Sequence, residues 1–277
     1  MTSRPILRFA PSPNGYLHLG HAYSALFTWR AAAQCGGVAL LRSEDIDTGR
    51  CKPEFVAAIF ADLAWLGLSW PEPVWRQSQR FPVYAAAAER LKAQGLLYPC
   101  FCTRTEIAAK AEGPDPDGAP YYPGTCRHIP PAIAAARLAA GEPAQWRLDM
   151  DAALARIGER LGFPAPEGWE PVFPELWGDV VIVRKDTPTS YHLSVVVDDA
   201  AQGVTLVTRG MDLFAATAVH VVLQRLLDLD TPVYWHHELV LDEGEQKLAK
   251  SRGSQSLKSL REAGWSPEDV RRRLGFD

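Results

Sequence analysis

The strongest constraint on the fold lies in the first 41 residues, where a strand pattern, a dense turn, a helix pattern and a second strand pattern follow one another. Ile6 to Ala10 is a short, mostly apolar run, and residues 11–15 are all turn formers. A helical pattern then extends from about Gly20 to Ala33, and a second strand pattern covers Val38 to Leu41. Strands that alternate with helices in this way are typical of a parallel, doubly wound sheet.

The same alternation continues along the chain. Helices are expected at Glu54 to Leu66, Val83 to Gln94, Phe214 to Leu227 and Pro267 to Leu274. Strands are expected at Val180 to Val183, Leu193 to Val197, Val204 to Thr208 and Val233 to Leu241. Lys110 to Pro131 is rich in Pro and Gly and should be a loop. We predict an α/β nucleotide-binding domain whose first half is 1–97 and whose second half is 190–241, with a module inserted at 98–189 and a loop and short helix at 242–277.

Composition narrows the class of protein. The 277 residues are 47% hydrophobic and 22% charged, which suits a globular protein with a sizeable core. No apolar run is long enough to cross a bilayer or to act as a signal peptide, so we expect a cytoplasmic protein that does not bind membranes. Five cysteines, an odd number, argue against a disulfide framework. The net charge of -4 gives no general attraction to nucleic acid, so any RNA contact must use local patches.

The turn before the first helix contains a candidate anion site. His18, Gly20 and His21 lie where a strand passes into a helix, and the N-terminus of a helix attracts anions. Gly20 lets a ligand approach the backbone, and the two histidines can donate hydrogen bonds to phosphoryl oxygens. From these residues alone, a helix start with two surface histidines remains an alternative.

Two motifs at opposite ends of the chain resemble one family. RFAPSP at residues 8–13, followed by HLGH at 18–21, is similar to the HIGH signature of class I aminoacyl-tRNA synthetases of the glutamyl and glutaminyl branch. KLAKS at residues 247–251 resembles that branch's KMSKS loop, and its departures from the pattern remove no charge. The resemblance implies a Rossmann-type domain that binds ATP with Mg²⁺. The catalytic residues that it implies are His18, His21, Lys247 and Lys250, with His18, Gly20, His21 and Lys250 binding ATP.

Further motifs indicate the amino acid. Residues 41–50 resemble the LRxEDxDxxR element of glutamyl synthetases, which implies that Glu44 holds the substrate α-ammonium group. A glutamate side chain also needs a fixed cation, and Arg8 and Arg209 both fit this role. Residues 191–199 and 208–212 resemble two more elements of the family. The expected glutamate pocket is Arg8, Ala10, Ser12, Glu44, Tyr191 and Arg209. The residues alone leave open an acidic loop that caps the next helix and a half-buried strand position for Tyr191.

Three cysteines suggest a metal site. Cys100, Cys102 and Cys126 flank the Pro/Gly-rich loop, and zinc takes four ligands in a tetrahedron. Three unrelated thiols are the alternative. Residue chemistry favours His128 as the fourth ligand, because imidazole is a common zinc ligand. Similarity to the glutamyl-Q tRNA(Asp) synthetase family, which has a tyrosine four positions before the last cysteine, implies Tyr122 instead, in a structural Zn²⁺ site.

The length of the chain after KLAKS agrees with that resemblance. Only residues 252–277 follow, too few for the helical anticodon-binding domain that a glutamyl-tRNA synthetase carries. The glutamyl-Q family implies a monomeric ligase that activates L-glutamate without tRNA and transfers it to queuosine in the anticodon of tRNA-Asp. The alternatives are a shortened glutamyl-tRNA synthetase that charges the 3′ end of tRNA-Glu, a nucleotidyltransferase with a small-molecule acceptor, and a non-catalytic RNA-binding relative.

Overall fold

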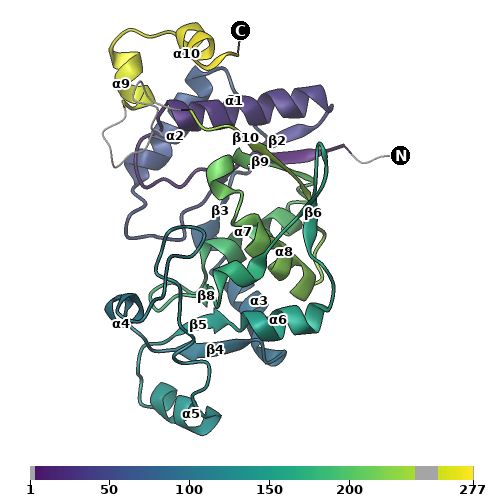
Figure 1. The fold of residues 1–277 in the computed structure, drawn as a ribbon. Coiled ribbons are helices and arrows are strands. Elements are labelled where there is room, and N and C mark those ends of the chain that lie inside the picture. The colour runs from purple at the N-terminus through teal and green to yellow at the C-terminus, as the bar shows by residue number, and fades with distance from the viewer. Residues whose placement is uncertain (1–3, 241–254, 277) are drawn as a thin grey trace. The chain divides into compact units, whose positions relative to one another are not determined.

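A computed structural model describes residues 4–240 and 255–276 (Figure 1). The chain forms two compact units. Unit 1 comprises residues 1–79, 203–214 and 232–277, and unit 2 comprises residues 80–202 and 215–231. The inserted module expected at 98–189 stays a prediction. None of the helices in the described parts of the chain is both long enough and apolar enough to span a membrane.

In its described residues, unit 1 has five strands, which form a three-stranded and a two-stranded parallel sheet. They are β1 (Ile6–Phe9), β2 (Val38–Ser43), β3 (Trp75–Arg76), β9 (Leu206–Gly210) and β10 (Val233–His237). β1 pairs with β2 and β2 with β3, while β9 pairs with β10. The N–H of Thr205 donates to the carbonyl of Ile6 at 2.9 Å, so β9 lies on the other side of β1. The chain therefore leaves β1 in one direction for β2 and returns on its opposite side as β9. Ligands bind at such a switch point in doubly wound sheets.

Four helices of unit 1 share one apolar core. They are α1 (Leu19–Gln34), α2 (Pro53–Trp65), α9 (Leu257–Glu262) and α10 (Pro267–Leu274). All four contribute buried side chains to it, among them Leu26, Leu63, Leu257 and Val270. α9 and α10, drawn in yellow in Figure 1, thereby join the first residues of the chain. Residues 257–276 are thus part of the core of unit 1, because the apolar faces of α9 and α10 complete it.

Unit 2 contains the antiparallel part of the fold. Its strands are β4 (Leu97–Cys100), β5 (Gln145–Leu148), β6 (Gly162–Ala165), β7 (Gly168–Pro171) and β8 (Val181–Val183). Its helices are α3 (Phe81–Ala93), α4 (Arg104–Ala108), α5 (Pro131–Ala139), α6 (Met150–Ile157), α7 (Tyr191–Ala201) and α8 (Thr217–Leu226). β4, β5 and β8 form one antiparallel sheet, and β6 and β7 form a hairpin. Residues 110–130 form no helix or named strand, which confirms the predicted loop.

One predicted element is wrong. Leu193–Val197 was expected to be a strand because of its valines, but these residues lie in the helix α7. The hydroxyl of Ser190 accepts from an N–H of the first helical turn, as an N-cap should. Asp198 is fully buried and accepts a 2.7 Å hydrogen bond from the hydroxyl of Tyr84 on α3. Capping and tertiary contacts override the β-propensity of valine here. Tyr191 is accordingly the first residue of a helix, and its alternative placement in a strand is also wrong.

Candidate active site and metal site

The HLGH turn forms the N-terminus of α1. His18 is the N-cap, and its Nδ1 accepts from the N–H of Gly20 at 3.1 Å. Nδ1 of His21 accepts from the N–H of His18 at 3.2 Å, which completes a capping box. Because Nδ1 accepts in both rings, the proton of each neutral imidazole lies on Nε2. The first turn of α1 therefore combines two Nε2–H donors with the positive end of a helix, an arrangement suited to phosphate.

The chain that follows the second motif is attached to this turn. Leu257 donates its N–H to the carbonyl of Leu17 at 2.7 Å, and Ser256 forms a β-bridge with His18. Residues shortly after KLAKS thus lie beside the histidines. Lys247 and Lys250 themselves lie outside the described residues, so their place at the phosphates stays a prediction.

Two arginines are buried on neighbouring strands at the switch point. Arg8 on β1 is 5% exposed, and Arg209 on β9 is 4% exposed. Nη1 of Arg8 donates to the carbonyl of Thr208 at 3.4 Å, and the hydroxyl of Thr208 shares a 2.7 Å hydrogen bond with that of Thr28 on α1. Two guanidinium groups on adjacent strands add a positive charge that attracts anions. A carboxylate is one group that a guanidinium binds well, through two hydrogen bonds.

A histidine that the sequence analysis overlooked holds Arg209. The Nε–H of Arg209 donates to Nε2 of His236 at 3.2 Å, and the guanidinium lies 4.9 Å from the centre of the Tyr234 ring. Burial, and then the charges of Arg209 and His237, lower the pKa of His236 to about 3. A neutral imidazole can accept this hydrogen bond. The signal in the sequence was a polar pair at the end of a strand, where ligands bind in parallel sheets.

The acidic loop after β2 is also built into unit 1. Glu44 is 9% exposed and pairs with Nη2 of the fully buried Arg42 at 3.1 Å. Its N–H donates to the carbonyl of Pro11 at 3.1 Å, which joins the acidic loop to the loop before α1. Asp45 accepts from the N–H and the hydroxyl of Ser78 at 2.8 Å each. The N-cap of α2 is Lys52, which makes no side-chain cap, so the alternative in which this acidic loop caps the next helix is wrong.

The remaining predicted pocket residues fall in both units. Ala10 and Ser12 are half-buried in the loop between β1 and α1, within unit 1. Tyr191 starts α7 in unit 2, with its ring centre 5.6 Å from that of the buried His220. Because Tyr191 belongs to the other unit, its membership of the glutamate pocket stays a prediction.

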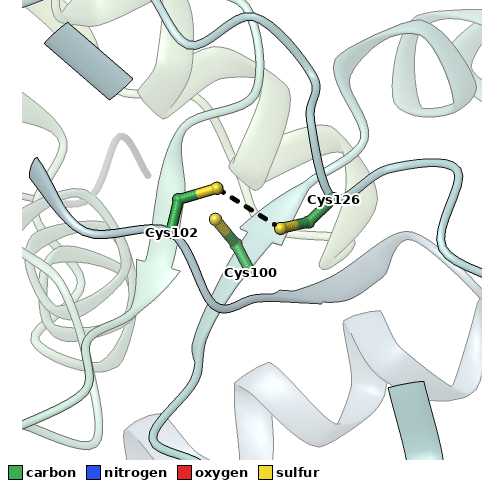
Figure 2. A group of neighbouring side chains, drawn as sticks. All are labelled: Cys100, Cys102 and Cys126. Carbon is green, nitrogen blue, oxygen red and sulfur yellow. Dashed lines mark hydrogen bonds between the residues drawn. The ribbon is translucent and has the colours of Figure 1, made fainter. Parts of the chain in front are cut away.

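Unit 2 brings the three cysteines together at the end of β4. Figure 2 shows the sulfur atoms of Cys100, Cys102 and Cys126 converging, and they all lie within 4.8 Å of one another. The sulfur atoms of Cys102 and Cys126 are 3.5 Å apart. A disulfide would place them about 2.05 Å apart, whereas tetrahedral zinc with bonds of about 2.3 Å places its sulfur ligands roughly 3.8 Å apart. The spacing of the thiols is therefore compatible with metal ligands.

Tyr122 lies at the fourth side of the cluster. Its hydroxyl oxygen accepts from the thiol of Cys100 at 3.3 Å and from the N–H of Cys126 at 2.8 Å. Tyr122 is 5% exposed, whereas His128 is exposed and does not belong to the group of potential ligands among the described residues. The loop geometry thus places the phenol beside the thiols and directs the imidazole elsewhere.

Hydrogen bonds around Cys100 favour its thiolate. Burial alone raises the pKa of a thiol, but hydrogen bonds with Tyr122, Arg147 and Gln145 outweigh burial and lower the pKa of Cys100 to about 7. The guanidinium of Arg147 lies 3.8 Å from the centre of the Tyr122 ring. A thiolate is the form that binds metal, so this environment suits a metal ligand.

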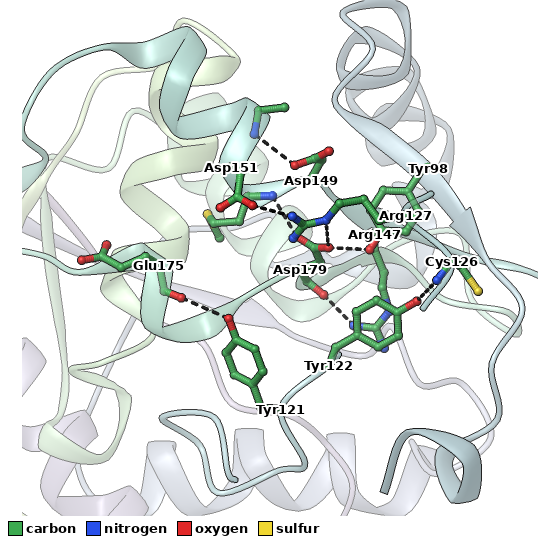
Figure 3. A network of polar contacts seen from close by, with 12 residues as sticks. Tyr98, Tyr121, Tyr122, Cys126, Arg127, Arg147, Asp149, Asp151, Glu175 and Asp179 are labelled. Carbon is green, nitrogen blue, oxygen red and sulfur yellow. Dashed lines mark hydrogen bonds and ion pairs between the residues drawn. The ribbon is translucent and has the colours of Figure 1, made fainter. Parts of the chain in front are cut away.

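A buried carboxylate anchors the loop that carries Cys126 to the sheet of β4, β5 and β8 (Figure 3). Asp179 is 1% exposed and accepts two hydrogen bonds from Arg127, at 2.7 and 2.6 Å. It also accepts from the hydroxyl of Tyr98 on β4 at 2.5 Å and from the N–H of Met150 at 2.9 Å. Because Arg127 directly follows Cys126, this network fixes the position of one thiol relative to β4.

Comparisons with known proteins agree with this geometry. The family model for the catalytic domain of class I tRNA synthetases (E and Q) matches residues 6–276. A Glutamyl-Q tRNA(Asp) synthetase of Rhodobacter capsulatus is 48% identical over 98% of this chain and 100% of its own. One from Geobacter sulfurreducens is 42% identical over 92% and 78%. The chain belongs to this family of class I synthetases. Family membership makes it a ligase, in agreement with the sequence motifs.

Solved structures support the fold. A glutamate tRNA ligase from Elizabethkingia meningosepticum, crystallised with its amino acid, superimposes with a TM-score of 0.73 at 28% identity. The match covers 91% of this chain, which spans about half (53%) of that ligase. A methionyl-tRNA synthetase of Mycobacterium tuberculosis gives a TM-score of 0.59 at 15% identity, which shows the fold alone. The predicted Rossmann-type class I catalytic domain is confirmed.

Proposed function

We propose that this synthetase uses ATP to activate L-glutamate in the absence of tRNA and transfers it to queuosine in the anticodon of tRNA-Asp. The observation that carries the first step is the pair of buried arginines, Arg8 and Arg209, at the switch point of the sheet that also carries the HLGH turn. The acceptor rests on the relatives, which bear the name Glutamyl-Q tRNA(Asp) synthetase and cover nearly all of this chain.

The activation step is an attack on ATP. An oxygen of the glutamate α-carboxylate forms a bond to the α-phosphorus, and the bond from that phosphorus to the β-phosphate oxygen breaks, which releases pyrophosphate. The Nε2–H groups of His18 and His21 donate to phosphate oxygens as charge develops on them. Lys247 and Lys250 offset the charge on the leaving pyrophosphate, and Mg²⁺ supplies further charge neutralisation when ATP binds.

Amino-acid selection follows from the charge of the pocket. Glu44, held as an ion pair by Arg42, offers a carboxylate to the substrate α-ammonium group. A glutamate carboxylate can pair with the charges of Arg8 and Arg209, whereas a glutamine side chain offers them only a neutral amide. Glutamate should therefore be strongly preferred over glutamine in ATP–pyrophosphate exchange without tRNA. Equal turnover of the two amino acids would refute the proposed pocket.

We further propose a structural zinc ion held by Cys100, Cys102, Tyr122 and Cys126. The donor set fits, because three thiols and one phenol oxygen converge at zinc-like spacing. Zinc would supply a cross-link between β4 and the loop that ends at Cys126. Metal analysis of the purified protein is the test, and a folded sample without metal would refute the site.

The RNA acceptor needs its own experiment. Radiolabelled glutamate and ATP are incubated with tRNA-Asp and tRNA-Glu, each with and without queuosine. Label on queuosine-containing tRNA-Asp alone supports the proposal. Label on queuosine-free tRNA-Glu supports the second candidate, a shortened glutamyl-tRNA synthetase. That candidate is favoured by the 37% identity to an Aquifex aeolicus glutamate–tRNA ligase, of which this chain spans 54%.

A further inference from the structure

The guanidinium of Arg209 is constrained by neighbours on its own sheet. In the parallel pairing of β9 and β10, His236 is the direct partner of Arg209. The side chains meet through the 3.2 Å hydrogen bond from Nε of Arg209 to Nε2 of His236, and the Tyr234 ring lies 4.9 Å below the guanidinium. The hydrogen bond to His236 limits the rotation of the guanidinium about its side chain, and the contact with Tyr234 orients its plane. His236 and Tyr234 together therefore hold the guanidinium in one orientation.

His236 is suited to be a constant acceptor. The edge of its ring packs against Phe214, with ring centres 4.9 Å apart, and it lies parallel to Tyr234, at 9°. Because Nε2 accepts, the ring proton lies on Nδ1. Burial and the neighbouring charges of Arg209 and His237 disfavour the doubly protonated ring, so it accepts throughout the physiological pH range.

A guanidinium can meet a carboxylate through two kinds of edge. One edge is formed by Nε and one Nη, and the other by both Nη groups. The bond to His236 uses Nε, so a carboxylate that pairs with Arg209 meets the edge formed by the two Nη groups. The direction of that edge is set by His236.

We propose that His236 is a positioning residue for amino-acid selection: it accepts the Nε proton of Arg209 and thereby presents the two Nη groups of this arginine to a carboxylate of the substrate. This rests on the proposed function, in which Arg209 binds glutamate. Without the acceptor the guanidinium can rotate about its stem, and glutamate binding loses a pre-oriented partner. Affinity should fall for glutamate and not for ATP, because Arg209 is assigned to the binding of the amino acid.

The test uses two substitutions of this residue in the full chain. His236→Phe keeps an aromatic ring but removes the acceptor, and His236→Gln keeps an acceptor at similar reach. In tRNA-independent ATP–pyrophosphate exchange, His236→Phe should raise the KM for glutamate by about 10-fold or more, the usual cost of a hydrogen bond to a charged group. The KM for ATP should stay within about twofold. His236→Gln should have a glutamate KM close to that of the wild-type protein.

A neighbouring histidine provides the matched control. His237 follows on the same strand and contacts the rings of Tyr23 and Phe27 on α1. His237→Gln should leave the glutamate KM within about twofold, and thermal melts should show that all three variants are folded. An unchanged glutamate KM in folded His236→Phe overturns the inference, as does an equal rise in His237→Gln or in the KM for ATP. Should His236→Phe not fold, a His236→Gln enzyme whose glutamate KM rises about 10-fold overturns it as well.

The proposed function can fail separately. A wild-type protein without glutamate-dependent exchange refutes glutamate activation, whatever the variants do. A wild-type protein that exchanges with glutamate, together with a His236→Phe enzyme of the same KM, refutes only the role of His236.

Discussion

Asp62 on α2 is a buried carboxylate whose charge opposes folding. It is 0% exposed, and neither carboxylate oxygen has a hydrogen-bond partner. Its closest cation is Arg261 on α9, with Nη2 3.6 Å from Oδ1. Burial raises the pKa of Asp62 from 3.8 to about 6, and the charges of Arg261 and Lys258 offset this effect only in part. Asp62→Asn replaces the carboxylate with a neutral group of the same shape.

The size and sign of the effect follow from the two pKa values. Between about pH 4 and pH 6 the folded state binds more protons than the unfolded state, so the free energy of unfolding falls as the pH rises. The difference between 3.8 and about 6 corresponds to about 3 kcal/mol, since one pKa unit is worth about 1.4 kcal/mol. The stability is fully present below the unfolded pKa and is lost above the folded pKa. From about pH 5 to about pH 8 the wild-type protein should lose about 1.4 kcal/mol relative to Asp62→Asn.

Urea unfolding followed by tryptophan fluorescence at several pH values measures this difference. The quantity compared is how the difference in the free energy of unfolding between the two proteins changes with pH. A cost of the asparagine amide that does not depend on pH therefore cancels. Wild-type and variant curves that shift in parallel from pH 5 to pH 8 would show that Asp62 does not titrate as a buried acid. A variant that loses stability relative to wild type as the pH rises would reverse the sign and refute the reasoning.

Three further predictions concern the metal site and the substrate. Asp179→Asn should lower the free energy of unfolding by about 3 kcal/mol and speed the loss of zinc to a chelator. Asp151 is an exposed carboxylate that pairs with the same Arg127. Asp151→Asn should therefore cost less than about 1 kcal/mol, and an equal loss of stability in the two variants would contradict the role of Asp179. Tyr122→Phe should weaken zinc binding at least about tenfold while His128→Ala leaves it unchanged, as measured by competition with a chromogenic chelator; the reverse order would identify the imidazole as ligand. Glu44→Gln should raise the glutamate KM at least about tenfold in ATP–pyrophosphate exchange, and an unchanged KM would remove Glu44 from the pocket.

The sequence predicted most of unit 1 because its signals are local. The strand, turn and helix at the start of the chain are each specified by neighbouring residues, and α2 ends where Gly67 adopts a left-handed conformation, with φ +75°. The parallel pairing followed from the alternation of strands and helices. Residues 193–197 show the limit of such reasoning, since their propensity favours a strand while a cap and a buried Asp198 make them helical.

The neighbours of the predicted site residues could not be read from the sequence. His236 lies 27 positions after Arg209, and only the register of β9 and β10 brings them together. Asp179 lies 52 positions after Arg127, and its role depends on antiparallel strands whose pairing has no short-range signal. Motifs identify residues that touch substrates, whereas the residues that orient them are determined by tertiary contacts.

The HLGH turn shows why a catalytic motif can have a fixed spacing for a structural reason. His18 and His21 occupy the N-cap and the third helical position of α1, the two positions of a capping box. Each imidazole uses Nδ1 to accept from a backbone N–H, and this same bond places the ring proton on Nε2. Capping therefore determines the tautomer that the proposed phosphate binding requires. A change in the spacing of the two histidines would lose the cap and the aligned donors together, because one set of hydrogen bonds provides both.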